Sequence, residues 1–156
     1  MQRLFSLLFV FGLAACSNLT EPTASLPGAA GNPQSQEYFK AVVGDRVLFA
    51  VDEAVLSAQA RQTLEGQARW LIDNPTFNAR IEGHADEQGT REYNLALGAR
   101  RAAAVKEFLV ARGVADGRLD TVSFGKERPI EICSNEACYA RNRRAVTLVI
   151  AGGETT

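Results

Sequence analysis

The sequence predicts an α+β domain, a two-layer sandwich in which helices pack on one face of a mixed sheet. Two observations predict this class. Between residues 37 and 152 the hydrophobic period alternates between two and about 3.6 residues, in the order strand, helix, strand, helix, strand, short helix, strand. The segment also holds about 115 residues without an internal repeat, which is enough for one hydrophobic core. One domain is therefore expected at 37–152.

Turn and cap residues divide the first half of this segment. Residues 42–49 have the pattern of a strand, a turn and a second strand, with Gly44-Asp45 at the turn. Apolar residues then recur every three or four positions over 56–71, as on one face of an amphipathic helix. Ser57 is a suitable N-cap for this helix, and Asn74-Pro75 ends it because proline cannot continue a helix.

The second half repeats the alternation of strand and helix. Phe77, Ala79 and Ile81 alternate with polar residues, which predicts a half-buried strand. A second helix is expected over 90–112, because apolar residues line one side of it and Gly113 follows as a C-cap. The remaining expected elements are a strand at 119–124, a short helix at 136–142 and a final strand at 145–150.

Residues 1–15 have the pattern of an export signal. Arg3 supplies a positive charge, and residues 4–13 form an apolar stretch that is too short to span a bilayer. The stretch ends in Leu13-Ala14-Ala15-Cys16, which resembles the lipobox of bacterial lipoproteins, so Cys16 is the predicted lipidation site. An ordinary signal peptide with a chance cysteine nearby is the alternative.

Residues 16–36 are predicted to be a lipidated cysteine and a flexible tether. Their Pro, Gly, Ser, Thr, Asn and Gln residues cannot bury enough apolar surface to order the chain. Fully extended, about twenty residues reach roughly 65 Å. More than one acyl chain on Cys16 would anchor the protein stably. Ser17 stands where Asp would retain a lipoprotein at the inner membrane, so we expect an outer-membrane lipid anchor and a periplasmic domain in a Gram-negative bacterium.

Composition excludes several classes of function. The chain carries 17 Lys and Arg against 18 Asp and Glu, a formal net charge of −1, which argues against nucleic acid as a partner. One His and three Cys leave little material for a histidine-based triad or a four-ligand zinc site. No cofactor and no metal are expected, and a binding module is favoured over an enzyme.

The densest polar segment, residues 82–94, lies between the strand ending near residue 84 and the following helix. Loops at the carboxyl ends of strands are where sheets of this kind usually place ligands, and the next helix begins with free N–H donors. Downstream lie the basic groups Arg100-Arg101 and Asn142-Arg143-Arg144. The segment therefore predicts a polar binding site at this edge of the sheet.

These motifs together resemble the OmpA-like peptidoglycan-binding domain, specifically its branch of peptidoglycan-associated lipoproteins of the Tol-Pal system. The resemblance covers about residues 43–150 and agrees with the lipobox. The matching motifs are Gly83-His84-Ala85-Asp86-Glu87, Gly89-Thr90, Glu92-Tyr93-Asn94, Leu97-Gly98, Arg100-Arg101-Ala102, Ser123-Phe124-Gly125-Lys126-Glu127-Arg128-Pro129 and Asn142-Arg143-Arg144.

The resemblance implies noncovalent capture of the peptidoglycan stem peptide at its diaminopimelate residue. The family's central contacts fall on Asp86, which would accept from the ligand ammonium, and Arg101, which would grip its carboxylate. Asp52, Asn94 and Thr90 are further candidate contacts. The resemblance also implies TolB and other Tol-Pal proteins as partners, and a role in envelope integrity and cell division.

Each candidate has a plainer interpretation. Asp86 could be a turn or cap residue, Arg101 a solvated helix residue, and Asn94 a brace for the loop. Arg143 and Arg144 could equally form structural ion pairs or touch the peptide. His84 is expected to be packed and hydrogen-bonded, and Tyr93 is expected to pack beneath the loop.

Two features depart from the family's usual pattern. Relatives often carry Phe-Asp-x-Asp after the first strand, whereas this chain has Phe49-Ala50-Val51-Asp52, so the contribution of Asp52 is open. Cys133 and Cys138 are five positions apart, and an oxidising compartment favours a disulfide between them. Two free thiols or half of a metal site are the alternatives.

Two other functions compete. Glu82, His84, Asp86 and Glu87 could form an acid–base or zinc centre of a wall-degrading enzyme, but the chain holds no second His for it. An OmpA-like outer-membrane lipoprotein outside the Tol-Pal system is the closer alternative. Loss of TolB binding with wall binding intact would favour it.

Overall fold

The computed structural model describes residues 31–132 and 134–152. The expected export signal, Cys16, most of the expected tether and Cys133 lie outside these residues. The elements in chain order are α1 (Gln36–Tyr38), the π-helical turn η1 (Phe39–Gly44), β1 (Arg46–Leu48), α2 (Ala58–Asp73), β2 (Phe77–His84), α3 (Arg91–Ala111), the 3₁₀ turn η2 (Asp116–Arg118), β3 (Leu119–Gly125), α4 (Glu136–Asn142) and β4 (Arg144–Ala151). In the described part of the chain, no helix is both long and apolar enough to cross a bilayer.

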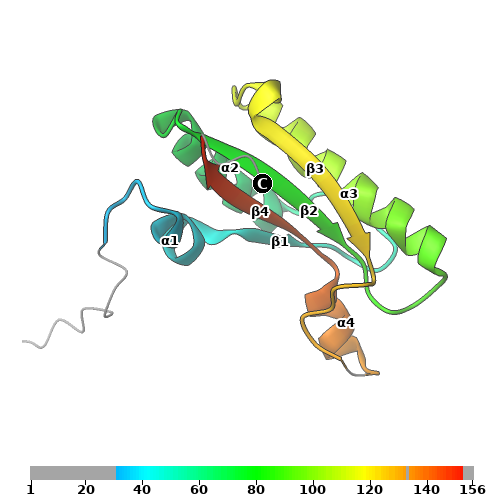
Figure 1. The fold of residues 1–156 in the computed structure, drawn as a ribbon. Helices are drawn as coiled ribbons and strands as arrows, with labels where there is room; N and C mark the ends of the chain where they lie inside the picture. Colours follow the sequence, from blue (N-terminus) through cyan, green and yellow to red (C-terminus); the bar gives the residue numbers. More distant parts are fainter. Residues whose placement is uncertain (1–30, 133, 153–156) are drawn as a thin grey trace, which may run out of the picture.

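The four strands form one mixed sheet in the order β1-β4-β2-β3. The last strand, β4, is antiparallel to both β1 and β2, whereas β2 and β3 are parallel and joined through α3. The carboxyl ends of β2 and β3 therefore meet the start of β4 at one edge, which is the lower end of the sheet in Figure 1. The expected α+β class with a mixed sheet is confirmed.

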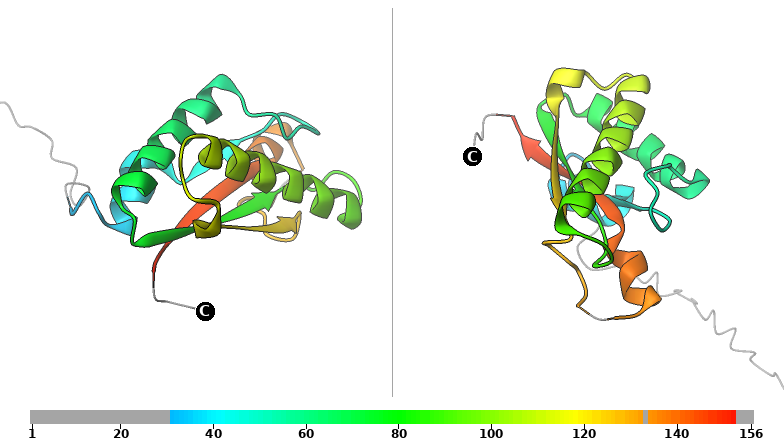
Figure 2. Two further views of the ribbon diagram at one scale, coloured as in Figure 1. Left: turned by 90° about the horizontal axis from the view of Figure 1, so that it is seen from above. Right: turned by 90° about the vertical axis from the view of Figure 1, so that its right-hand side faces the viewer.

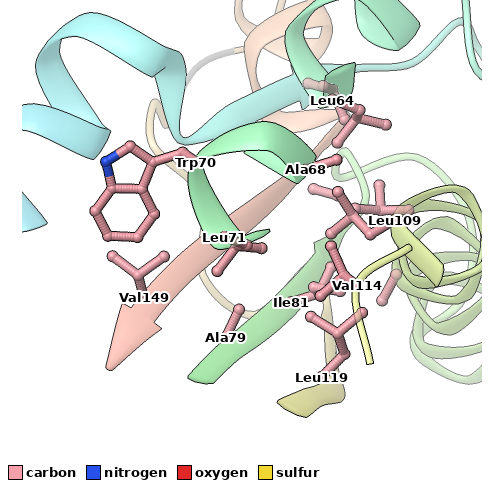
Figure 3. Close-up of a cluster of buried hydrophobic side chains, with 14 of the residues drawn as sticks. Leu64, Ala68, Trp70, Leu71, Ala79, Ile81, Leu109, Val114, Leu119 and Val149 are labelled. Atoms are coloured by element: carbon pink, nitrogen blue, oxygen red, sulfur yellow. The ribbon is translucent and has the colours of Figure 1, made fainter. Parts of the chain in front are cut away.

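Helices α2 and α3 cover one face of the sheet, and Figure 2 shows both on the same side. The core lies between these two layers and is built from side chains that alternate along the strands and recur along the helices. Its centre consists of Leu64, Leu71, Ile81, Val105 and Leu109, all without exposed surface. Figure 3 shows Leu64, Leu71, Ile81 and Leu109 converging from different elements.

The sequence prediction was wrong for residues 42–43, which form the end of η1 and not a strand. Val43 packs against the hydrophobic core beside Gly66, and the Gln67 amide donates to the Gly44 carbonyl at 2.7 Å. Gly44 has φ +91°, a left-handed conformation that turns the chain into β1. Val43 therefore fits the side of α2 while Val42 stays exposed, and only the second predicted strand forms.

The other predicted elements are confirmed, with their caps. The Ser57 hydroxyl accepts from the Ala60 N–H and begins α2, and the Thr90 hydroxyl does the same for the Tyr93 N–H at the start of α3. Gly113, at φ +100°, follows the end of α3. Ordered contacts begin inside the segment predicted as tether, because the Trp70 indole donates to the Pro33 carbonyl at 2.8 Å.

A glycine pair sets the distance between β2 and α3. A Cβ on Gly83 would lie 1.8 Å from the Gly98 carbonyl oxygen, and one on Gly98 would lie 2.4 Å from the Ser123 hydroxyl. The helix backbone therefore rests directly on the end of the strand. Arg101, one turn beyond Gly98, is brought against the strand end and the residues that follow β1.

Candidate functional site

A pocket of about 170 Å³ lies at the edge of the sheet where β2 ends. One wall is the β2–α3 loop and the first turns of α3, and the other is the turn that follows β1. Its lining residues are Val51, Asp52, Asp86, Gln88, Gly89, Tyr93, Asn94 and Leu97. The structure thus brings together three of the predicted contacts, Asp52, Asp86 and Asn94.

Asp86 is a buried acceptor at the base of this pocket, with 7% of its surface exposed. Its Oδ2 accepts from Arg143 Nη1 at 3.0 Å, and its Oδ1 accepts from the Gln88 N–H at 3.2 Å. Asp86 therefore acts as a turn residue of the β2–α3 loop, which was one of the two interpretations of its sequence position. Its carboxylate also lines the pocket. Oδ1 retains acceptor capacity because an ionised carboxylate can take about four hydrogen bonds.

Arg101 is fully buried and is not a solvated helix residue. Its guanidinium donates to the carbonyls of Glu53 at 2.8 Å, His84 at 2.8 Å and Ala50 at 3.1 Å, and it lies over the Phe49 ring. Burial lowers its pKa to about 10, partly opposed by the charge of Asp86, so the group remains a cation at neutral pH. Three of the five N–H groups are used, which leaves two.

The ion-pair partner of Asp86 is Arg143 and not Arg101. Arg143 follows α4. Its guanidinium donates to the carboxylates of Asp86 and Glu136 and, at 3.2 Å, to the Phe49 carbonyl. Burial disfavours the charge of Arg143, but the hydrogen bonds that Arg143 donates to Glu136 and Asp86 outweigh this effect and raise its pKa. Arg143 is therefore the structural ion-pair former that the sequence left as one of two possibilities.

The rim opposite Asp86 is closed by Asp52 and Tyr93. Asp52 has φ +59°, a left-handed turn conformation that is uncommon for a residue other than glycine. Its Oδ1 accepts from the Tyr93 hydroxyl. The expectation that Tyr93 packs beneath the loop was wrong, because this hydrogen bond and the Arg100 guanidinium beside the ring hold Tyr93 at the surface.

Asn94 and Thr90 shape the loop. The Asn94 amide is buried and donates to the Gln88 carbonyl at 2.7 Å, and Lys126 donates to the Gly89 carbonyl at the same distance. Thr90 caps α3 and lies outside the pocket lining. In this structure both residues act as braces of the loop that presents Asp86.

The OmpA family model matches residues 48–143 of this chain. The chain belongs to the OmpA family. Its relatives include the peptidoglycan-associated lipoproteins of Rhizobium meliloti, 47% identical over 96% of this chain and 88% of the relative, and of Brucella melitensis, 48% identical over 96% and 90%. The chain therefore falls in the branch of the peptidoglycan-associated lipoproteins.

One solved structure agrees with this assignment, and a second shares the fold. The crystal structure of the peptidoglycan-associated lipoprotein from Burkholderia pseudomallei superposes with a TM-score of 0.69, at 36% identity, over 78% of this chain and 99% of the other. The carboxyl-terminal domain of MotB from Helicobacter pylori has a TM-score of 0.65 at 19% identity, over 70% and 86%, which shows a shared fold.

The ring of His84 is packed as expected, but it makes no hydrogen bond among the described residues. Its ring is buried and stacks on Phe124, with the centroids 5.6 Å apart. Neither ring nitrogen has a hydrogen-bond partner among the described residues, and Nε2 lies 3.7 Å from the Glu82 carboxylate. Burial, helped by the charges of Arg144 and Arg128, lowers its pKa to about 4. His84 is therefore neutral at pH 7.

Two further observations bear on the expected chemistry. Among the residues that the structure describes, no three His, Cys, Asp or Glu side chains gather as a metal site would require. Cys138 is a disulfide cysteine, but Cys133 lies outside the described residues, so their pairing stays a prediction.

A larger pocket of about 390 Å³ lies beside β1, between α2 and Ile130, away from Asp86.

Proposed function

We propose that this chain is an outer-membrane lipoprotein that binds peptidoglycan noncovalently through the diaminopimelate residue of the stem peptide. One observation carries the proposal. Asp86 lines the pocket with spare acceptor capacity, and it interacts electrostatically with the buried cation Arg101. Family membership supports it, because the relatives at 47% and 48% identity are named peptidoglycan-associated lipoproteins.

The chemistry of diaminopimelate suits these two side chains. Its side-chain end is a zwitterion, with an ammonium and a carboxylate on one carbon. A carboxylate such as Asp86 accepts from the ammonium, and a guanidinium such as Arg101 offers its remaining N–H groups to the carboxylate. Both groups are preorganised by neighbouring hydrogen bonds, which reduces the ordering cost of binding. We infer binding without bond cleavage as the function of this site.

The proposal places the lipid on Cys16 and the wall-binding domain at the far end of the segment 16–36. The sequence Leu13-Ala14-Ala15-Cys16 supports the anchor. The family branch supports a partnership with TolB and other Tol-Pal proteins, and a role in envelope integrity and division. An OmpA-like lipoprotein outside the Tol-Pal system is the alternative, and a pull-down of TolB distinguishes the two.

Cosedimentation with purified diaminopimelate-type sacculi tests the proposal. Residues 17–156 should pellet with the sacculi, whereas Asp86→Asn and Arg101→Lys should remain largely in the supernatant. Glu127→Gln is the matched control, because Glu127 pairs with Arg91 on an exposed surface and should pellet like the parent. Circular dichroism confirms that each variant is folded. A parent that stays in solution contradicts the proposal.

A further inference from the structure

The two buried charges of the site differ in how they are compensated. Every hydrogen-bond acceptor of Arg101 is a backbone carbonyl, from Ala50, Glu53 and His84. Carbonyls satisfy the N–H groups but carry no net charge. Among the described residues, no direct ion pair therefore balances the positive charge of Arg101.

Asp86 belongs to a linked set of three ionised groups. Arg143 donates to the Asp86 carboxylate through Nη1 and to the Glu136 carboxylate through Nη2. Two carboxylates share one guanidinium, so the set has a net charge of −1. With Glu136 absent, Asp86 and Arg143 would form a neutral pair, and the attraction of Asp86 for a cation would be largely cancelled.

We infer that Glu136 is a positioning residue that determines specificity for the ammonium group of the ligand. It acts through Arg143, by sharing the guanidinium that would otherwise neutralise Asp86. The pocket is then lined by the negative charge of Asp86, which interacts electrostatically with the buried positive charge of Arg101. This combination suits a zwitterion and not a simple anion or cation. This inference rests on the proposed function.

The position of Glu136 is suited to this role. Glu136 begins α4, whose N-cap Asn135 accepts from the Cys138 N–H at 3.2 Å, so the first turn of the helix is fixed. The side chain of Arg143 is only 5% exposed, and it also donates to the Phe49 carbonyl. The Glu136 side chain itself is 66% exposed and contributes little to the core, so its substitution should leave the fold intact.

Isothermal titration calorimetry on the full-length chain in detergent tests the inference. The probes are the tripeptide L-Ala-D-Glu-meso-diaminopimelate and an analogue ending in 2-aminopimelate, which keeps the terminal carboxylate and lacks the ammonium. The variants are Glu136→Gln, the conservative Glu136→Asp, and Glu127→Gln as a control that removes the same charge from an unconnected pair with Arg91.

The inference predicts a change in selectivity and not a general loss of binding. Glu136→Gln should weaken the diaminopimelate tripeptide about three- to fivefold, the size expected for a mostly exposed charge. Its affinity for the 2-aminopimelate analogue should equal that of the parent. Glu136→Asp should recover part of the loss, and Glu127→Gln should bind both probes like the parent.

Three outcomes overturn the inference in different ways. If Glu136→Gln binds the tripeptide like the parent, Glu136 has no part in recognition, while the proposed function stands. If the variant loses the same factor for both probes, Glu136 only supports the structure of α4. A parent that binds neither probe removes the proposed function, and the inference with it.

Discussion

Two buried arginines lie close to the candidate site, and they are held in opposite ways. Arg101 on α3 is surrounded by neutral carbonyls, and burial lowers its pKa to about 10. Arg143 after α4 is bound by two carboxylates, which raise its pKa despite burial. Burial alone therefore does not decide the role of a charge: Arg143 is paired with Asp86 and Glu136, whereas Arg101 has no carboxylate hydrogen-bond partner among the described residues. In the proposed function its charge serves the ligand.

The largest expected effect disturbs the surroundings of Arg101 on α3 and leaves those of Arg143 after α4 unchanged. In Gly83→Ala the new Cβ would lie 1.8 Å from the Gly98 carbonyl oxygen, and neither backbone can yield cheaply. Pushing α3 off β2 should lower the free energy of unfolding by more than about 3 kcal/mol. Urea denaturation measures it. Gly117→Ala, where nothing lies within 4 Å of the new Cβ, should change stability by less than about 0.5 kcal/mol.

Replacing Arg101 should lower the free energy of unfolding by nearly as much. Arg101→Met leaves the carbonyls of Ala50, Glu53 and His84 without their donor, so we expect a loss of about 3 kcal/mol in urea denaturation. Arg100→Met is the control, because Arg100 is exposed on the same helix. Equal stability of the two variants would show that the carbonyl cage around Arg101 contributes nothing.

His84, at the carboxyl end of β2, should make the stability of the fold depend on pH. His84 has a pKa of about 4 in the folded protein against about 6.5 when unfolded, so the unfolded chain takes up the proton first as pH falls. Stability should be highest above pH 6.5 and fall towards pH 4, by about 2 kcal/mol at pH 5.

The histidine-free variant isolates this effect, because His84 is the one histidine of the chain. In His84→Phe the aromatic packing against Phe124 is kept and the titrating group is gone. Its thermal midpoint should vary less between pH 7 and pH 5 than that of the parent. Parallel pH profiles for the two proteins would exclude His84 as the source.

The smallest expected loss of stability is that of Asp86→Asn, and it tests whether Arg143 has other partners that Arg101 lacks. In Asp86→Asn, Arg143 keeps Glu136 and the Phe49 carbonyl, so the cation stays paired. We therefore expect a loss of only about 1 to 1.5 kcal/mol in urea denaturation, clearly below that of Arg101→Met. A loss as large as for Arg101→Met would mean that Asp86 is the main support of Arg143.

Local patterns predicted most of the fold, because helix period, caps and strand alternation are readable over short windows. Ser57, Thr90 and the residues around Pro75 set the limits of α2 and α3 as expected. The prediction failed at residues 42–43 because β-branched residues favour strands in general, whereas here Val43 packs on α2 beside Gly66 and Val42 is exposed. A tertiary contact decided that segment, and no local pattern carries it.

The site was predictable in its residues but not in its pairings. The family motifs pointed to Asp86 and Arg101, and the structure brings Asp86 to the pocket. The ion pair of Asp86 with Arg143 spans 57 positions, and only the packing of β4 beside β2 creates it. The partners of Arg101 are backbone carbonyls, which leave no trace in the sequence. Glu136 was also missed, although it begins the predicted short helix that ends at Asn142, one residue before Arg143.

The central claim is that a diaminopimelate-containing peptide binds between Asp86 and Arg101. Titrating ¹⁵N-labelled residues 17–156 with L-Ala-D-Glu-meso-diaminopimelate tests it most directly. The account predicts saturable shifts of the amides around Asp86, Gln88 and Asn94, together with the Arg101 side-chain Nε–H. Shifts confined to the larger pocket beside β1, around Leu48 and Ile130, or no shifts at millimolar peptide, would contradict it.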